Sequence, residues 1–359
     1  MTLFNFGQIT IIAAVLSVSI VGASPDDRVF LAATPERGEA PDAEIGPDGT
    51  IHLAYVKGEN AFYVRSEDGG KTFSAPLRIN SEENTVHPSN MFRGPDLAVG
   101  KNGRVHVILY GNGYQRKLPP QDWGVFYSHF DSGTKSFSKT VNLNHKPSDN
   151  FSLAADRNGN VAVVWMAGKL FLSSSADNGE TFAAPELVPN ADPCECCASR
   201  ALFARDGTLV IDYREKANNV RDMHLLLRGQ GQTLFIKRKL SGIPWQVNGC
   251  PMTGTYLTSA GSRLIAAWET KGQIFFSRNA SNGSEPVQEV KVAERGKWPV
   301  ALAAGDGTLL VSWKNGYTLY WQLFDKTDAP LGEVHSTPGS NPNRHSGVVN
   351  AKGEFILMN

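Results

Sequence analysis

The sequence predicts an all-β fold, a β-propeller of four-stranded antiparallel blades, and three observations support that prediction. Tight turns built on glycine recur at separations of 54, 56, 48, 54, 46 and 46 residues. A strand-like run that ends in an aromatic residue follows each of the first six turns. One turn sequence, S-x-D-x-G-x-T-F, occurs twice. The turn glycines are Gly49, Gly103, Gly159, Gly207, Gly261, Gly307 and Gly353.

The number of blades follows from the strands around these turns. The runs after the turns are residues 51–55, 105–110, 161–165, 209–213, 264–268, 309–313 and 354–358, and each is interpreted as an inner strand of one blade. The seventh unit is too short to form a blade alone. The early run 28–33 would complete it, pairing the two ends of the chain and removing open sheet edges. We therefore expect seven blades; six are the alternative, in which C-terminal strands complete a blade begun at the N-terminus.

The N-terminus carries an apolar run, residues 9–23, that ends in Val21-Gly22-Ala23 and is typical of a signal peptide. We expect residues 1–23 to be removed and residues 24–359 to form a single propeller domain that is secreted or periplasmic. No Lys or Arg precedes the run, so an uncleaved anchor is the alternative, although the run is short for a membrane span. No stable membrane insertion is expected after cleavage.

Charge restricts the classes of partner. The chain has 35 basic and 35 acidic residues, a formal charge of zero and a pI near 7.1. Such a balance argues against a nucleic-acid partner, because that kind of binding depends on an excess of positive charge. We expect a monomer.

The repeated turn carries the clearest local signal. Residues 66–73 and 175–182 each follow one strand-like run and precede another. In each, the Asp (Asp68 or Asp177) can accept hydrogen bonds from the backbone of the turn, a glycine supplies positive φ, and the terminal Phe packs beneath. The pattern resembles the Asp-box of sialidases and their relatives, an element of β-propeller blades. That resemblance implies the propeller fold; it does not imply an activity.

The position of a loop within the repeating unit predicts on which of two faces of the ring it lies. The turn glycines and the two S-x-D-x-G-x-T-F turns belong to one end of the ring, which we call the turn face. The starts of the first strands and the ends of the second strands belong to the opposite end, which we call the mouth face. Charged residues gather in the mouth-face loops, and sialidase-like propellers place their site on this face. Loops on a rigid scaffold commonly carry function.

The resemblance to sialidases also implies candidate catalytic residues. Sialidases hold the substrate carboxylate with three arginines, use a Tyr–Glu pair as nucleophile, and use an Asp as acid/base. Phe92-Arg93-Gly94-Pro95 matches three positions of their F/Y-R-I-P motif, and a guanidinium suits a carboxylate. The candidates are Arg93, Arg214 and Arg344 for the carboxylate (Arg221, Arg200 or Arg37 as substitutes), Asp96 or Asp42 as acid/base, and Tyr213 (or Tyr317 or Tyr320) beside Glu269 or Glu215 as nucleophile.

The four cysteines fall in two places that repeat phase brings together on the mouth face. They are Cys194, Cys196 and Cys197 in a C-x-C-C segment, and Cys250 in W-Q-V-N-G-C-P. In an exported protein, Cys250 is expected to form a disulfide with Cys196 or Cys197. The alternatives are a metal site, with copper or zinc on the four cysteines, and a reactive thiol beside Arg200. Sialidase-like propellers of unknown activity carry a similar C-x-C-C segment followed by W-x-x-x-G-C-P.

Two functional hypotheses follow. The first is an exported sialidase-like propeller that recognises or hydrolyses an acidic saccharide or glycoconjugate at the channel mouth, a reaction that needs no cofactor. The alternative is a non-enzymatic binding scaffold whose cysteines form a structural disulfide or a soft-metal site.

Overall fold

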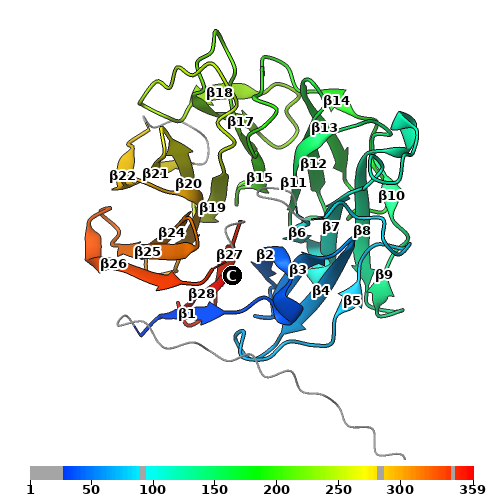
Figure 1. Cartoon of the computed structure of the whole chain (residues 1–359), viewed down its shortest axis with the longest axis horizontal. Coiled ribbons are helices and arrows are strands. Elements are labelled where there is room, and N and C mark those ends of the chain that lie inside the picture. Colours follow the sequence, from blue (N-terminus) through cyan, green and yellow to red (C-terminus); the bar gives the residue numbers. More distant parts are fainter. Residues whose placement is uncertain (1–26, 89–93, 281–286, 341–343) are drawn as a thin grey trace, which may run out of the picture.

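The structure, a computed structural model, describes residues 27–88, 94–280, 287–340 and 344–359. Within these ranges it is a β-propeller: seven sheets are arranged in a ring around a central axis (Figure 1). The predicted signal peptide lies outside the described residues. No helix in the described ranges is long and apolar enough to cross a membrane.

Six blades run in chain order, each built from sequential antiparallel strands. Blade 1 contains β2 (Glu39–Ile45), β3 (Ile51–Lys57), β4 (Asn60–Ser66) and β5 (Leu77–Arg78). Blade 2 contains β6 (Asp96–Val99), β7 (Val105–Tyr110) and β8 (Val125–Asp131), with both β9 (Ser136–Phe137) and β10 (Val141–Asn142) pairing with β8. Blade 3 contains β11 (Asp149–Ala155), β12 (Val161–Met166), β13 (Leu170–Ser175) and β14 (Glu186–Leu187).

Blade 4 contains β15 (Arg200–Phe203), β16 (Leu209–Arg214), β17 (Met223–Arg228) and β18 (Ile236–Lys239). Blade 5 contains β19 (Thr255–Ala260), β20 (Arg263–Thr270), β21 (Gln273–Ala280) and β22 (Val290–Ala293). Blade 6 contains β23 (Lys297–Ala303), β24 (Leu309–Asn315), β25 (Thr318–Phe324) and β26 (Pro330–Pro338). Short 3₁₀ turns lie at η1 (Pro35–Arg37), η2 (Lys101–Gly103) and η3 (Pro120–Asp122).

The seventh blade joins the two ends of the chain, as predicted. Strand β28 (Phe355–Met358) pairs antiparallel with β27 (Ser346–Val349) and parallel with β1 (Val29–Ala32). This blade has three strands in the described residues, and β1 and β28 lie side by side in Figure 1. The prediction of seven blades is confirmed, and the ring closes through a parallel pair rather than an antiparallel one.

The first strand of each blade lines the channel, where neighbouring first strands contact one another around the ring. The strands after the turn glycines, expected as inner strands, are the second strands of their blades. They are buried on both sides: all residues of β7, β12 and β16 are buried. One hydrophobic cluster fills each of the seven spaces between adjacent blades in the described residues. The aromatic residues at the ends of the second strands, such as Trp165 and Trp268, are part of these clusters.

The turns form as the sequence predicts. All seven turn glycines have φ between 61° and 98°, a backbone conformation that is unfavourable for other residues. In the first S-x-D-x-G-x-T-F turn, Asp68 accepts hydrogen bonds from the backbone N–H of Thr72 (2.9 Å) and from the hydroxyls of Thr72 and Ser66. Asp177 makes the same three contacts in the second turn. The Asn178 N–H donates to the Gly159 carbonyl (2.8 Å), which places this turn on the turn face.

Candidate functional site

Two sets of residues near the mouth face, one a step deeper in the channel than the other, can be counted from the turn glycines. Residues nine positions before each glycine form the mouth ring: Ala40, Gly94, Asn150, Ala198, Met252, Trp298 and Arg344. Residues seven positions before form the axial ring, one step deeper: Asp42, Asp96, Ser152, Arg200, Gly254, Val300 and Ser346.

Local backbone irregularities set the direction of the side chains in the mouth ring. Strands β2, β11 and β23 each lose register with their partner between the two rings. Ala40, Asn150 and Trp298 have φ of 48°, 45° and 55° at these places. Such bulges twist a strand locally and redirect its side chains, which explains how a strand end can turn toward the channel.

The axial ring is joined across blades by a repeated hydrogen bond. Asp42 accepts the N–H of Leu97 (2.8 Å) in the next blade, and Asp96 accepts the N–H of Leu153 (2.9 Å). Ser152 and Ser346 make the equivalent contact with the next blade, each at 3.0 Å. These side chains therefore satisfy buried backbone donors, a structural task.

Arg200 is the one axial-ring residue with a positively charged side chain. Its Nη2 lies 2.9 Å from Asp42 Oδ1, and its Nη1 is bonded to Asp96 Oδ1. Asp42 is 4% exposed and Asp96 1%, so this is a buried triad in which every carboxylate oxygen has a partner. The Arg200 guanidinium also lies 5.1 Å from the centre of the Tyr256 ring.

The two acids of the triad titrate differently. Burial opposes ionisation of both, but Arg200 and Arg344 hold the pKa of Asp42 below its ordinary value. Burial and repulsion from Asp42 raise the pKa of Asp96 to about 6. A pair of carboxyls with separated pKa values is typical of acid/base sites, and also of buried ion networks. Because the partners of Asp96 are all internal, the contacts favour the second interpretation.

Arg344 is the charged member of the mouth ring. Its Nη2 donates to the Pro95 carbonyl, and its Nε has no hydrogen-bond partner in the described residues. A Cβ at the neighbouring mouth-ring position Gly94 would lie 2.5 Å from the Ala40 Cβ, so the close approach of blades 1 and 2 requires glycine there. Arg344, Asn150 and Trp298 line a hollow of about 40 Å³ over Arg200, and the Asn150 Oδ1 also has no partner in the described chain.

A second cavity continues along the channel on the other side of Arg200. It has a volume of about 210 Å³, and its walls include Glu44, Leu153 and Tyr256. Glu44 accepts the N–H of Val99 (2.7 Å). Burial raises the pKa of Glu44 to about 8, so this carboxyl is protonated at neutral pH.

A larger hollow lies on the rim of the mouth face between blades 1 and 2. Its volume is about 460 Å³, and its walls include Asn80, Tyr110, Asn112, Arg116 and Phe126. This is within the size range of pockets for small molecules, whereas the 40 Å³ hollow has room only for a small polar group.

The other predicted catalytic residues lie away from the channel. Arg214 is fully buried: its Nε donates to Thr253 Oγ1 (2.9 Å), and its other nitrogens donate to the carbonyls of Arg221 and Glu269. Tyr213 is also fully buried, in the cluster between blades 3 and 4, with its hydroxyl 2.5 Å from Glu215 Oε2.

The structure thus brings Asp96 and Arg344 together at the channel, with Asp42 and Arg200. It brings Arg214 and Glu269 together beside the cysteines, and it leaves Tyr213 apart from both. Arg93 lies outside the described residues and stays a prediction. Sequence reasoning overlooked Tyr256 and Glu44. It named Asp42 beside Asp96 as an acid/base candidate and Arg200 only as a substitute arginine, although all three share the position seven residues before a turn glycine.

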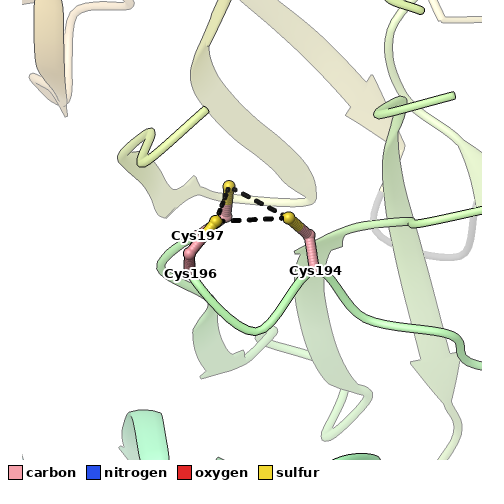
Figure 2. Close-up of side chains that lie close together, drawn as sticks. All are labelled: Cys194, Cys196 and Cys197. Carbon is pink, nitrogen blue, oxygen red and sulfur yellow. Dashed lines mark hydrogen bonds between the residues drawn. The ribbon is translucent and has the colours of Figure 1, made fainter. Parts of the chain in front are cut away.

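The cysteines converge between blades 4 and 5, as repeat phase predicted. Cys196 and Cys250 form a disulfide with Cα atoms 6.1 Å apart, which confirms one of the two expected pairings. Cys194 and Cys197 are buried thiols with sulfur atoms 3.7 Å apart. Figure 2 shows the Cys194, Cys196 and Cys197 side chains converging from one loop; the Cys196 sulfur lies 3.5 Å from that of Cys194 and 4.0 Å from that of Cys197.

The thiols sit in a charged, buried environment. The Cys194 thiol and the Arg214 guanidinium lower the pKa of Cys197 to about 6, against the effect of burial. The Cys197 thiol and burial raise the pKa of Cys194. Glu269 is 3% exposed, and burial raises its pKa to about 7.

Comparisons with known proteins bear on the fold. No family model matches the chain, and no curated protein matches it. Among solved structures, a functionally unknown protein from Desulfotomaculum acetoxidans is 11% identical with a TM-score of 0.56, covering 94% of this chain and 98% of that one. The α-L-arabinanase of Penicillium chrysogenum is 13% identical with a TM-score of 0.54, covering 88% and 99%. A Hadza microbial sialidase is 12% identical with a TM-score of 0.52, covering 76% and 62%. The chain therefore has the fold of the sialidase-like propellers, and identities this low establish the fold alone.

Proposed function

We propose that the protein recognises an acidic saccharide at the channel mouth, with the guanidinium of Arg344 as its anchor. The observation that carries this proposal is the composition of the mouth ring, in which Arg344 is the one charged member. A carboxylate is the natural partner for a guanidinium, because two parallel N–H donors match its two oxygens.

The geometry suits a carboxylate that enters while its sugar ring stays outside. The hollow at Arg344 has room for a small polar group, since its volume is about 40 Å³. Arg344 Nε and Asn150 Oδ1 are both without partners in the described residues, so a carboxylate and a neighbouring hydroxyl would satisfy one each. Arg93, next to Gly94 of the mouth ring, is proposed as the second guanidinium.

Recognition is favoured over hydrolysis by the placement of the other candidates. Both oxygens of Asp96 accept internal hydrogen bonds, and Tyr213 is buried with Glu215. Neither is in position to act on a sugar at the mouth. The Cys196–Cys250 disulfide supports the expected export to a secreted or periplasmic location. Two of the structural neighbours named above, the sialidase and the arabinanase, are glycan-acting proteins by name.

Isothermal titration with N-acetylneuraminic acid and methyl glucuronide tests the proposal, with methyl glucoside as the neutral control. Arg344→Gln should weaken binding of the acids at least tenfold, because hydrogen bonds to a charged group contribute about 1.5–3 kcal/mol. The matched control is Arg157→Gln, an exposed arginine in a turn on the opposite face, which should leave affinity unchanged.

Two results would overturn the proposal. One is equal affinity of wild type and Arg344→Gln for the acids. The other is binding of the neutral glycoside as tight as that of the acids, which would favour the 460 Å³ hollow between blades 1 and 2. Turnover of fluorogenic sialosides or uronides that disappears in Arg93→Ala would extend recognition to hydrolysis; absence of turnover would leave the protein a binding scaffold.

A further inference from the structure

Two buried arginines beside the cysteines donate no hydrogen bond to a carboxylate in the described residues, although Glu269 and Asp222 lie near Arg214. Arg214 is 0% exposed and donates only to a threonine hydroxyl and to backbone carbonyls. Arg221 is 6% exposed; its Nη2 lies 3.4 Å from the Gly249 carbonyl, and its Nε and Nη1 have no partner in the described chain. Buried guanidinium groups need negative charge nearby, and both Glu269 and the cysteine sulfur atoms lie close enough to Arg214 to supply it.

The sulfur atoms are the groups that can carry negative charge and also bind a metal ion. The sulfur atoms of Cys194, Cys196 and Cys197 form a triangle with sides of 3.5, 3.7 and 4.0 Å. The circle through three points so spaced has a radius of about 2.2 Å, close to the metal–thiolate distance of about 2.3 Å. An ion slightly out of the plane of the three atoms would therefore reach all of them with little movement of the loop.

We propose that Cys194, Cys196 and Cys197 form a Cu(I) site that is closed while the Cys196–Cys250 disulfide is intact. Thiolates select soft ions such as Cu(I). Three thiolates and one Cu⁺ carry a net charge of −2, and the guanidinium groups of Arg214 and Arg221 lie close enough to offset that charge.

Opening the site is a two-electron reduction by a dithiol. The dithiol is oxidised to its disulfide and gives two electrons and two protons, and the Cys196–Cys250 bond breaks to two thiols. Cu⁺ then displaces one proton each from Cys194, Cys196 and Cys197. Cys250, which is exposed, is released from the site and is not needed as a ligand.

Anaerobic titration of Cu(I) against the chelator bicinchoninate tests this proposal on the full chain. Reduced wild type should bind one Cu(I) per chain with thiolate-to-copper charge-transfer absorption, and the oxidised protein should bind none. The sharpest variant is Cys250→Ser, which frees Cys196 without disturbing the triangle and should bind Cu(I) without prior reduction. Cys194→Ser and Cys197→Ser should each weaken binding more than tenfold.

The arginines give a readout that separates a built site from adventitious thiol binding. Arg221→Gln should weaken Cu(I) binding at least tenfold, while Arg157→Gln should not change it. Failure of both reduced wild type and Cys250→Ser to bind Cu(I) would overturn the proposal, as would Zn²⁺ displacing Cu(I) from the reduced protein. Metal and saccharide use different side chains, so either proposal can fail alone.

Discussion

Replacing Arg200 with methionine should destabilise the protein strongly, because it leaves two buried carboxyls facing each other without their cation. Asp42 and Asp96 are 4% and 1% exposed, and both pair with Arg200. Removing one partner of a buried ion pair costs about 3–5 kcal/mol. We expect a loss of that size at pH 8 in urea unfolding, whereas Arg157→Met, at an exposed position, should stay within about 0.5 kcal/mol of wild type.

The pH dependence gives this prediction its sign. Without Arg200, burial would raise the folded-state pKa of Asp42, as it already raises that of Asp96. A carboxyl with a raised pKa in the folded state binds its proton more tightly there, so it favours folding at low pH and loses that advantage as pH rises. The cost of Arg200→Met should therefore shrink at pH 5. A destabilisation below about 1 kcal/mol at pH 8, or one that is equal at both pH values, would refute the described triad.

The remaining predictions concern one carboxyl, one turn and the disulfide. Burial raises the pKa of Glu44 to about 8 from an ordinary 4.5, so the free energy of unfolding of wild type should fall as pH rises between these values, by up to about 1.4 kcal/mol per pH unit. Glu44→Gln should show a flatter dependence of stability on pH. Parallel dependences for wild type and variant would contradict the prediction. Asp68→Ala removes the acceptor of the first S-x-D-x-G-x-T-F turn and should cost about 1 kcal/mol without changing saccharide affinity. A loss of saccharide affinity without a loss of stability would instead place the binding site on the turn face. Cys250→Ser should lower the stability of the oxidised, metal-free protein by about 2–4 kcal/mol and leave the reduced protein unchanged; equal melting of wild type and variant under oxidising conditions would argue against the bridge.

The features that could be predicted from the sequence are those set by local chemistry. A turn that needs positive φ requires glycine, so Gly49 and its six counterparts mark the blades directly. The S-x-D-x-G-x-T-F turn satisfies its own backbone through Asp68, so its conformation is encoded in eight residues. Ring closure by β1 also follows, because the seventh unit lacks strands of its own.

The features that could not be predicted depend on pairs distant in the chain. Arg200 bonds Asp42 and Asp96 from 158 and 104 residues away, and only the closed ring brings them together. Tyr213 is a candidate nucleophile only through the resemblance to sialidases, and alternation along β16 directs its ring into the space between blades 3 and 4. The choice of Cys196 over Cys197 depends on the turn of the loop, in which the Cys197 N–H donates to the Cys194 carbonyl (3.0 Å).

The two rings suggest how charged residues on this face divide between structure and function. In the axial ring, Asp42, Asp96, Ser152 and Ser346 each accept an N–H from the next blade, so acids there satisfy the backbone. Arg200, at the same position, forms ion pairs with both acids through its guanidinium, so its charge is neutralised inside the protein. The mouth ring lies two residues earlier in each repeat and contains no acid. The Nε–H of its one charged member, Arg344, has no acceptor in the described structure. The depth of a residue in the ring, rather than its type, therefore indicates whether its charge can be offered to a ligand.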